Sequence, residues 1–332
     1  MTLKAMIFAA GYGTRMSTLS DLLAKPALPF YGKPLIAHTL TWLARAGVTT
    51  TVVNLHHNAP TVVDAVNQHT PNGMEIIFSR ENEILGTGGG LKAAAANFEK
   101  DAFFIAINGD VFTQINLKIP LRMHRAESPL ATLVLTDNPD HRELFGVGID
   151  VNKQITDFWG EPENTRALRH CAFTGIHIID PRLLKSLPDS GYACIKEQAY
   201  LPALFAQQTL MSTVMGGHWF DLGTPQRYLD AHVKMLNNAG GLCGYPERSP
   251  GVFSADPLPP GLTVKQPVVV GPGLTAEKGS RMGPCAFLGA NVELREKVHV
   301  QHAVVWDNTQ LTTSISHAIA APDGIVVSTK SD

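Results

Sequence analysis

Short apolar runs alternate with segments of helically spaced apolar residues along roughly the first 235 residues of the chain. The runs that read as strands are residues 3–9, 50–55, 74–78, 103–107, 131–135, 171–179 and 210–215. Residues 35–46 and 91–98 have helical spacing, and the first of these segments stops at Gly47, a residue type that favours helix C-termini. Strands that alternate with helices predict an α/β fold with a Rossmann-like, doubly wound and mostly parallel sheet. Ligands in such sheets bind at the carboxyl ends of the strands.

The pattern changes after residue 236. Residues 237–260 are rich in Gly, Pro, Ser and Asn, which indicates a linker. Beyond it, small aliphatic residues recur every six positions, at Val264, Val270, Ala276, Met282, Leu288, Leu294 and Val300. A six-residue period is typical of a parallel β-helix, in which each hexad forms one face of a triangular coil. An irregular run of short strands would not keep this period. The predicted domains are residues 1–238, a linker at 239–260 and a short β-helix at 261–332.

Composition adds the expected cellular setting. Of the 332 residues, 44% are hydrophobic and 17% are charged, which is typical of a soluble globular protein. A net charge of −2 gives no electrostatic basis for binding nucleic acid or an anionic membrane. No apolar stretch reaches the ~20 residues that a membrane span needs. The four cysteines form no C-x-x-C pair and are expected to be free thiols in a reducing cytoplasm; they are Cys171, Cys194, Cys243 and Cys285.

A glycine-rich loop, Ala9-Ala10-Gly11-Tyr12-Gly13-Thr14-Arg15-Met16, follows the first predicted strand. Gly11 and Gly13 allow the backbone to wrap around phosphate and aim its N–H groups inward. Arg15 offers a planar charged fork, and Lys25, stiffened by Pro26, offers a compact charge. The loop is neither a Walker A motif nor a dinucleotide fingerprint. Taken alone, it could equally be a tight strand-to-helix turn.

With Arg15 and Lys25-Pro26 in place, this loop resembles that of the sugar-1-phosphate nucleotidyltransferases. Three further segments match the same family in the same order: Leu85-Gly86-Thr87-Gly88-Gly89-Gly90, Asn108-Gly109-Asp110 and Trp219-Phe220-Asp221-Leu222-Gly223-Thr224-Pro225. The β-helix tail is also common in the family, where it is left-handed. The resemblance implies the fold of the nucleotide-diphospho-sugar transferases for residues 1–238.

The resemblance also implies roles for particular residues. Arg15 and Lys25 are the implied catalytic residues, and Asp110 and Asp221 the implied ligands of a Mg²⁺ ion. The implied nucleotide-binding residues are Ala9, Ala10, Gly11, Gly13, Thr14, Arg15, Thr87, Gly88, Gly89, Asn108 and Gly109. For Thr87 a second reading is a helix N-cap, and both readings can hold.

The sugar side departs from the family pattern. Many members have Glu-Lys-Pro in mid-domain, whereas this chain has Glu161-Pro162 without the lysine. Lys196 is a candidate replacement, and a solvated residue at a helix start is an equally good reading of it. The family's contact region for the sugar contains Gly175, which could instead form a β-bulge. Trp159 and Trp219 are expected to be packing residues.

The implied reaction joins an NTP and a sugar 1-phosphate into an NDP-sugar with release of pyrophosphate. Mannose-1-phosphate guanylyltransferase is the first choice, because of the β-helix tail. N-acetylmuramate-1-phosphate uridylyltransferase is the alternative, favoured by the missing lysine. A catalytically silent regulatory homologue is a third reading, but Lys25, Asp110 and Asp221 are all present. The tail is too short for an acyltransferase cleft and is expected to serve assembly of a homo-oligomer.

Overall fold

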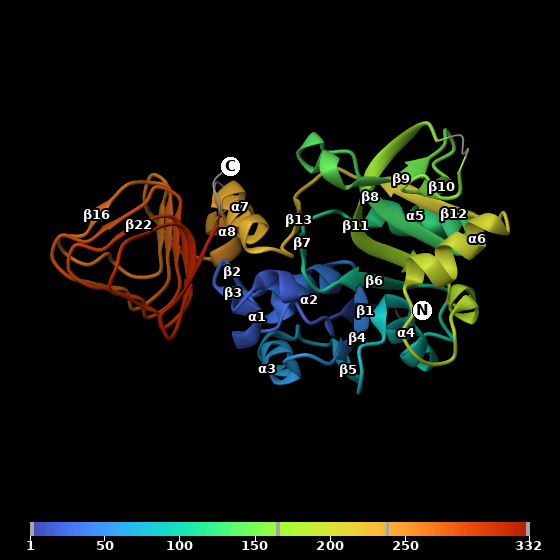
Figure 1. Ribbon diagram of the computed structural model, residues 1–332, viewed down its shortest axis with the longest axis horizontal. Helices are drawn as coiled ribbons and strands as arrows, with labels where there is room; N and C mark the ends of the chain where they lie inside the picture. Colours follow the sequence, from blue (N-terminus) through green and yellow to red (C-terminus); the bar gives the residue numbers. More distant parts are fainter. Residues whose placement is uncertain (1–2, 164–166, 237–238, 330–332) are drawn as a thin grey trace. The chain divides into compact units, whose positions relative to one another are not determined.

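The structure, a computed structural model, describes residues 3–163, 167–236 and 239–329 (Figure 1). The chain divides into two compact units. The first comprises Met1–Tyr12 and Ile36–Trp219, and the second comprises Gly13–Leu35 and Phe220–Asp332. The chain therefore enters the second unit directly after the start of the glycine-rich loop, leaves it, and returns near Phe220. No helix among the described residues is long and apolar enough to cross a membrane.

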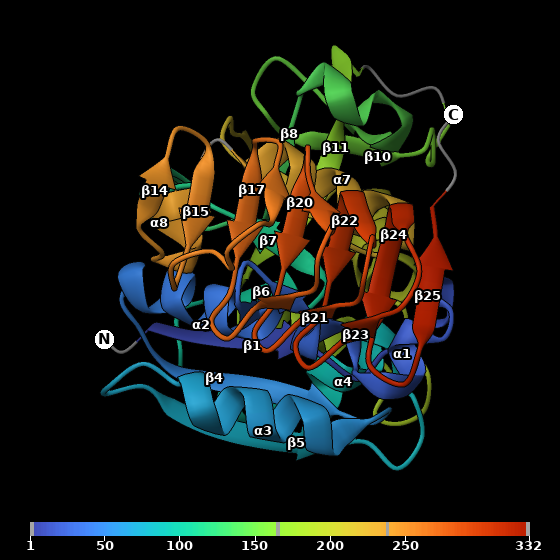
Figure 2. The same ribbon diagram turned by 90° about the vertical axis from the view of Figure 1, so that its left-hand side faces the viewer.

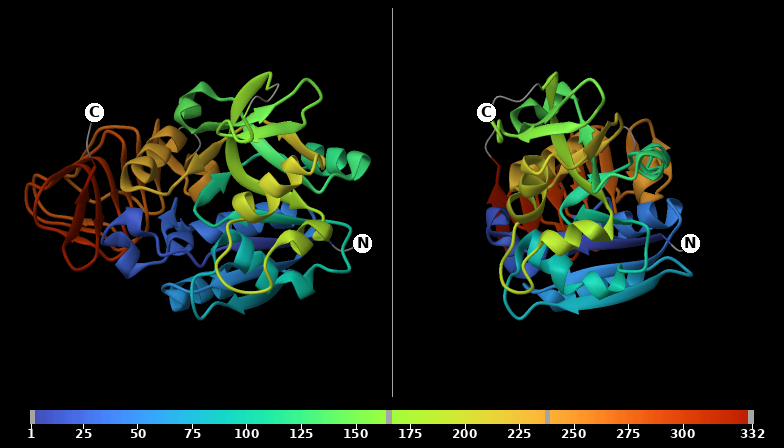
Figure 3. Two further views of the ribbon diagram at one scale, coloured as in Figure 1. Left: turned by 45° about the vertical axis from the view of Figure 1, so that its right-hand side comes forward. Right: turned by 90° about the vertical axis from the view of Figure 1, so that its right-hand side faces the viewer.

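A nine-stranded sheet forms the centre of the first unit. Seven strands follow the order β10-β9-β11-β6-β1-β4-β5, and β8 pairs with both β11 and β12. The strands are β1 (Leu3–Phe8), β4 (Val48–Leu55), β5 (Glu75–Arg80), β6 (Phe104–Asn108), β8 (Ala131–Thr136), β9 (Phe145–Ile149), β10 (Ile155–Phe158), β11 (Arg169–Ile179) and β12 (Leu210–Val214). Figures 1 and 3 show β4 and β5, in blue to cyan, at one end of this sheet.

Strand direction differs between the two parts of the sheet. Around β1 the pairs are parallel, with Met6 opposite both Val52 and Ala106. The long strand β11 runs antiparallel to β6, β8 and β9. The predicted α/β class is confirmed. The hydrophobic pattern could not separate the parallel strands from the antiparallel ones, because buried strands of either kind are continuous apolar runs.

Helices cover the sheet of the first unit. They are α2 (Leu35–Arg45), α3 (Ala59–His69), α4 (Gly86–Ala93), α5 (Lys118–Glu127) and α6 (Leu201–Phe205), with shorter helical turns η3 (Ala95–Asn97), η4 (Pro139–Leu144), η5 (Pro181–Ser186) and η6 (Lys196–Tyr200). One core cluster joins the strand residues Met6 and Val52 to Leu91 of α4 and Leu201 of α6. This packing holds the carboxyl ends of β1 and β6, which carry the predicted site residues, in a rigid layer.

The C-terminal part of the second unit has three stacks of parallel strands, the arrangement of a three-sided β-helix (Figure 2). The first stack contains β15 (Val252–Ser254), β17 (Val268–Val270), β20 (Ala286–Leu288), β22 (His299–Val305) and β24 (Ile315–Ala321). The second contains β16 (Thr263–Val264) and β19 (Arg281–Met282), which continue onto the first residues of β22. The third contains β18 (Thr275–Ala276), β21 (Glu293–Leu294) and β23 (Gln310–Leu311). Strands β14 (Glu247–Ser249) and β25 (Ile325–Ser328) close the first stack with antiparallel pairs.

The six-residue spacing has a direct structural meaning. Met282 pairs with Val300 in the second stack, Leu288 belongs to the first and Leu294 to the third. Successive aliphatic anchors therefore visit successive faces, and these four side chains are all at most 1% exposed. The period stops after Val300, because Val305, the residue of β22 that pairs with Leu288 in the first stack, follows after five positions.

The outer side of the first stack is also apolar and buried. Its outward residues include Val269, Phe287, Val304 and Ile319, none more than 4% exposed. Helix α7 (Pro225–Met235) packs on β22 and β24. The Phe287 ring lies 5.3 Å from that of Tyr31. The β-helix is therefore packed against the part of the chain that carries Lys25, within one unit.

The rest of the second unit consists of short elements. They are η1 (Thr14–Met16), α1 (Leu19–Leu22), η2 (Lys25–Ala27), β2 (Pro29–Phe30), β3 (Lys33–Pro34) and α8 (Ala239–Cys243). Two further strands adjoin the predicted metal ligands: β7 (Val111–Thr113) directly follows Asp110, and β13 (Trp219–Asp221) ends at Asp221. The segment predicted as a linker, 239–260, contains α8, β14 and β15, and its β15 is the first strand of the β-helix stack. Asn237 and Asn238 lie outside the described residues.

Candidate functional site

Gly223 is the point on which three predicted site residues of the second unit converge. The Lys25 ammonium donates to the Gly223 carbonyl oxygen at 3.2 Å. The Gly223 N–H donates to Oδ1 of Asp221 at 2.8 Å. A Cβ placed on Gly223 would lie 3.0 Å from Nη2 of Arg15, so the guanidinium lies against this glycine. Arg15 and Lys25, ten residues apart, thus form one charged cluster with the distant Asp221.

The local sequence explains how Lys25 reaches that position. Pro26 lies inside η2, where its fixed φ suits a helical turn. The Lys25 side chain passes directly over Gly13, where an added Cβ would be 3.2 Å from Lys25 Cγ. Gly13 also has a φ of +70°, which side-chain-bearing residues rarely adopt. Gly11 has no such φ, and a Cβ there would meet nothing within 4 Å.

The Asp221 carboxylate has a second partner in the same unit. Its Oδ2 forms an ion pair with Nη1 of Arg227, one turn into α7. The helix begins with a capped first turn, because the Thr224 side chain accepts from the Arg227 N–H and Pro225 occupies the first turn. Arg227 was not identified from the sequence. Asp221 ends β13 and lies outside α7, so no helical spacing links it to Arg227 in the sequence.

A buried polar network in the first unit anchors the start of the glycine-rich loop. The Ala9 N–H donates to Oδ1 of Asn54 at 2.6 Å, and Asn54 Nδ2 donates to Oε1 of Glu81 at 2.7 Å. Oε2 of Glu81 accepts from the Leu85 N–H at 3.0 Å. Asn54 and Glu81 are 3% and 7% exposed. These two residues, which sequence reasoning missed, tie the loop after β1 to the second glycine-rich segment.

The second glycine-rich segment is explained first by packing. The N–H groups of Gly88 and Gly89 both donate to the Ala193 carbonyl, at 2.8 and 3.2 Å. Thr87 accepts from the Ile195 N–H at 3.1 Å through its hydroxyl, and it is not the N-cap of α4, a position held by Leu85. The alternative interpretation of Thr87 as a helix N-cap is therefore wrong, because its hydroxyl is hydrogen-bonded to residue 195 and Leu85 holds the cap position.

Asn108 and Gly175 lie together at the carboxyl end of β6. A Cβ on Gly175 would lie 2.9 Å from Asn108 Nδ2, and Gly175 has a φ of +76°. The register of β11 against β8 shifts between Phe173 and Ile176, so Gly175 is part of a β-bulge. This was the alternative prediction for Gly175 from the sequence. Trp219 holds this bulge by donating from Nε1 to the Thr174 carbonyl at 2.7 Å. The packing role predicted for Trp219 fits its 4% exposure.

Two histidines in this unit are buried and neutral. Burial lowers the pKa of His177 to about 3, and its Nδ1 lies 2.6 Å from the Tyr200 hydroxyl. Burial also raises the pKa of Tyr200 well above its usual value, so the tyrosine keeps its proton and donates it. Burial lowers the pKa of His124 to about 4, and its Nδ1 lies 2.9 Å from the Thr132 hydroxyl. These pairs belong to the core.

The predicted sugar-side residues also come together in part. Lys196 begins η6, and the negative charge of Glu161 is among the causes that raise the pKa of this lysine. The largest cause is its hydrogen bond to Glu197, whose Oε1 lies 2.7 Å from Nζ. Trp159 is 65% exposed, so the packing role predicted for it is wrong. The reason is its position in a hairpin turn, where the indole contacts the backbone of Gly146 while most of its surface stays exposed.

The predicted metal ligands belong to different units: Asp110 follows β6 in the first, and Asp221 ends β13 in the second. Among the described residues, no group of three or more His, Cys, Asp or Glu could hold a metal ion. Two carboxylates alone are nevertheless the donor set that suits Mg²⁺, which takes one or two carboxylates and completes its shell with water and phosphate oxygens. The donor chemistry therefore fits this ion.

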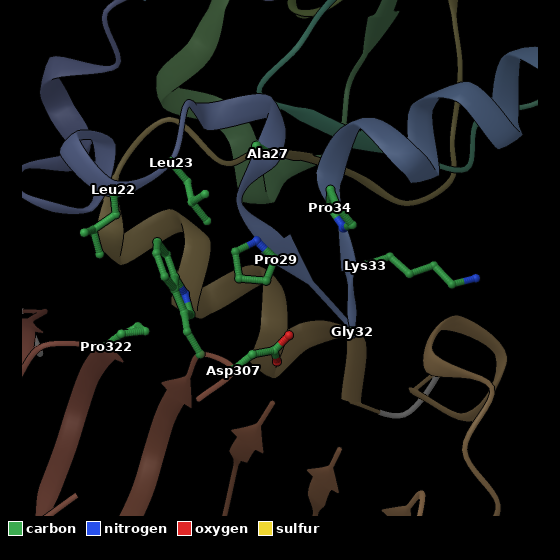
Figure 4. Close-up of a pocket in the computed structure, with 10 residues that line it drawn as sticks. Leu22, Leu23, Ala27, Pro29, Gly32, Lys33, Pro34, Asp307 and Pro322 are labelled. Carbon is green, nitrogen blue, oxygen red and sulfur yellow. The ribbon is translucent and has the colours of Figure 1, made fainter. Parts of the chain in front are cut away.

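A cavity of about 310 Å³ lies in the second unit beside the segment that carries Lys25 (Figure 4). Its walls are mainly apolar, and in Figure 4 the Lys33 side chain points away from the other labelled side chains. The lining residues are Leu22, Leu23, Ala27, Pro29, Gly32, Lys33, Pro34, Trp306, Asp307 and Pro322. This lining lacks the convergent cations that a triphosphate needs, so the candidate site is the cluster at Gly223.

Comparisons with known proteins identify relatives of this chain. Residues 4–238 match the family model described as nucleotidyl transferase. Mannose-1-phosphate guanyltransferase from Kluyveromyces lactis is 31% identical over 240 residues, and the match covers 71% of this chain. The corresponding protein from Saccharomyces cerevisiae is 30% identical over 240 residues, again covering 71% of this chain. The matches span 65% of the length of these relatives.

One solved structure illustrates the likeness in fold. HddC from Yersinia pseudotuberculosis aligns with a TM-score of 0.56 and 23% identity, over 69% of this chain and 98% of that one. Because this identity is low, the likeness concerns the fold alone. The α/β architecture of the first unit is thus that of a known fold.

Proposed function

Because the chain belongs to the nucleotidyl transferase family, we propose that it joins an NTP to a sugar 1-phosphate, giving an NDP-sugar and pyrophosphate. The observation that carries the proposal is the convergence of Arg15, Lys25 and Asp221 on Gly223. Two cations and a carboxylate at the end of a glycine-rich loop suit a polyphosphate, because fixed positive charge stabilises the anionic transition state.

The reaction needs no covalent nucleophile from the protein. An oxygen of the sugar phosphate attacks the α-phosphorus in line, and pyrophosphate leaves. Arg15, which is exposed and planar, holds the β- and γ-phosphates through its guanidinium. Lys25 neutralises the charge that grows on the α-phosphate and the leaving group. Positioning and electrostatics supply most of the rate enhancement in such transfers.

Asp110 and Asp221 would hold a Mg²⁺ ion. When bound, the ion would screen the repulsion between the two anionic substrates and polarise the α-phosphate. Arg227, the ion-pair partner of Asp221, orients that carboxylate. Ala9, Ala10, Gly11, Gly13, Thr14, Asn108 and Gly109 are proposed to line the nucleotide site. Thr87, Gly88 and Gly89 are proposed to face the base and ribose through surfaces not used in their contacts with residues 193 and 195.

The preferred substrate pair is GTP with mannose 1-phosphate, supported by the names of the curated relatives. The second candidate pair is UTP with N-acetylmuramate 1-phosphate. It is favoured by a specific observation: Glu161 and Lys196 are brought near one another although the usual Glu-Lys-Pro lysine is missing. In both cases Glu161, Gly175 and Lys196 are the proposed sugar-side residues.

The test is a pyrophosphate-release assay that crosses the four NTPs with a panel of sugar 1-phosphates. The wild-type protein should release pyrophosphate with one pair in the presence of Mg²⁺ and lose this activity with EDTA. Lys25→Ala should abolish turnover with an unchanged far-UV spectrum, whereas Lys33→Ala, an exposed lysine of the same segment, should leave turnover intact. Pyrophosphate release from no pair would refute the proposal and favour a silent regulatory homologue.

We also propose a cytoplasmic location and assembly through the β-helix. All four cysteines are free thiols, which suits a reducing compartment. The outer side of the first β-helix stack is covered within the chain by α7 and Tyr31. Association would therefore use the other two faces or the open ends of the coil. Light scattering of the purified chain would refute assembly if it gave the mass of a monomer at micromolar concentration.

A further inference from the structure

An exposed tryptophan stands out on the first unit. Trp159 is 65% exposed, whereas Trp219 and Trp306 are each 4% exposed. It occupies a two-residue hairpin turn between Phe158 and Glu161, and both turn residues have positive φ, 55° at Trp159 and 80° at Gly160. These signs match a type I′ turn, whose first position favours asparagine or glycine. A bulky residue held there is an outlier of the kind that clusters at functional sites.

The turn is firmly braced. The Phe158 N–H donates to the Glu161 carbonyl at 2.8 Å, and the Glu161 N–H donates back to Phe158 at 3.1 Å. The Trp159 N–H donates to the carbonyl of Gly146 in β9. The Gly160 N–H donates at 3.0 Å to Oδ1 of Asp157, a carboxylate that is fully buried. All four amides of the turn are therefore satisfied, so the indole is presented from a rigid support.

Two glycines of β9, Gly146 and Gly148, leave the space that the side chains of Trp159 and Asp157 occupy. A Cβ on Gly146 would lie 2.1 Å from Cε2 and 2.3 Å from Nε1 of the Trp159 indole. A Cβ on Gly148 would lie 1.9 Å from Oδ2 of Asp157. The indole therefore rests directly on the backbone of β9, which leaves its remaining surface open to solvent.

Charged groups frame the open side of the indole. The Lys196 ammonium lies 5.7 Å from the centre of the Trp159 ring. It also lies 2.7 Å from Oε1 of Glu197, and the exposed Glu161 side chain follows two residues after the tryptophan. An exposed aromatic ring with an ammonium over it, and with the carboxylates of Glu161 and Glu197 near that ammonium, matches the chemistry of a pyranose phosphate. Its C–H face is apolar, its hydroxyls donate to carboxylates, and its phosphate needs a cation.

This platform is physically joined to the second glycine-rich segment. Residue 195, next to Lys196, donates its N–H to the Thr87 hydroxyl at 3.1 Å. Two residues earlier, the Ala193 carbonyl accepts from Gly88 and Gly89. The segment that carries the Lys196 ammonium is thus held by the same contacts that place the start of α4. A ligand on the indole would lie beside the segment proposed to face the nucleotide.

We propose that Trp159 is the stacking platform for the pyranose ring of the sugar 1-phosphate, with Lys196 beside it for the phosphate. The proposal rests on the function proposed above and adds a binding residue that the sequence reading had assigned to packing. It commits to the sugar rather than to the base, because the carboxylates of Glu161 and Glu197 suit hydroxyl donors.

The decisive variant is Trp159→Asn. Asparagine followed by Gly160 is the preferred sequence of a type I′ turn, so this change removes the indole and keeps the turn. We expect an unchanged or higher Tm together with a KM for the sugar 1-phosphate raised about tenfold, the loss of one aromatic stacking contact. The KM for the NTP should stay within twofold, and Trp159→Phe should recover most of the sugar affinity.

A second readout does not depend on turnover. Titration of the full chain with mannose 1-phosphate, and separately with N-acetylmuramate 1-phosphate, should quench tryptophan fluorescence in the wild type with one of them and not in Trp159→Asn. If pyrophosphate is released but the variant keeps the wild-type sugar KM and the same quenching, the platform is refuted while the function stands. If the NTP KM rises instead, the indole serves the base and the proposal is overturned. If no pair releases pyrophosphate, the function fails, and quenching by a sugar 1-phosphate alone decides the platform.

Discussion

Gly223→Ala is the sharpest perturbation of the charged cluster, because it adds one methyl group at its centre. The new Cβ would lie 2.7 Å from Oδ1 of Asp221 and 3.0 Å from Nη2 of Arg15. Gly223 does not have a positive φ, so alanine introduces no backbone strain there. The substitution therefore acts on two functional groups while leaving the local fold accessible.

The size of the effect follows from these distances. Ordinary contact with a Cβ begins near 3.4 Å, so Asp221 Oδ1 must retreat by 0.7 Å (3.4 − 2.7) and Arg15 Nη2 by 0.4 Å (3.4 − 3.0). A 1 Å misplacement in an active site can cost about 100-fold in rate. We expect kcat to fall about 10- to 100-fold and the Mg²⁺ concentration for half-maximal rate to rise. The free energy of unfolding should change by about 1 kcal/mol or less.

The assay is steady-state pyrophosphate release with urea unfolding on the same samples. Gly216→Ala is the matched control, because a Cβ there meets nothing within 4 Å and its φ is not positive. The control should keep both kcat and stability. A Gly223→Ala protein with kcat within twofold of wild type would show that Arg15 and Asp221 do not take part in turnover. A large loss of stability would mean that the collision is absorbed by the fold instead.

Three further predictions concern the loop, the buried histidines and the β-helix. Gly11→Ala should leave the urea midpoint unchanged, because its Cβ meets open space, but should raise the KM for the NTP; an unchanged KM would remove Gly11 from the phosphate site. His177 and His124 have folded pKa values of about 3 and about 4, below the unfolded value of about 6.5. The unfolded chain therefore binds more protons below pH 6.5, and stability should fall between pH 7.5 and 5 by about 2 kcal/mol per histidine. Urea unfolding of His124→Gln should show a shallower fall than wild type. Phe287→Ala should cost about 3 kcal/mol in the same assay, whereas Gln301→Ala, on an exposed part of β22, should stay within about 0.5 kcal/mol of wild type.

The sequence predicted those parts of the fold that repeat or that form continuous apolar runs. The six-residue spacing identified the coil around Leu288, since each anchor has one inward position to fill. The β9–β10 hairpin was not predicted, because Gly146 and Gly148 interrupt its apolar pattern. These positions are glycine because the side chains of Trp159 and Asp157 occupy the space next to them. The hydrophobic pattern of one strand carries no information about side chains from another strand that pack against it.

The site shows the same division. Arg15 and Lys25 could be identified because the loop and its Lys-Pro are close in sequence, and the structure brings them to one glycine. Asn54 and Glu81 could not be identified, because their network exists only where the ends of β1, β4 and β5 meet. In a sequence, an Asn at the end of a strand can have many roles. The role of Asn54 becomes clear only in the structure, where its buried side chain accepts from the Ala9 N–H.

The glycines themselves now separate into two kinds. Gly13 and Gly88 each have a packing reason to lack a side chain, since a Cβ would meet a neighbour at 3.2 Å or closer. These residues would remain glycine in a protein that bound no nucleotide. Gly11 has neither a close neighbour nor a positive φ, so the fold alone does not require it. In a loop that ends in Arg15, the remaining physical reason for a bare backbone is the close approach of a ligand. Gly11 is therefore a more direct indication of phosphate binding than the glycines that the fold explains.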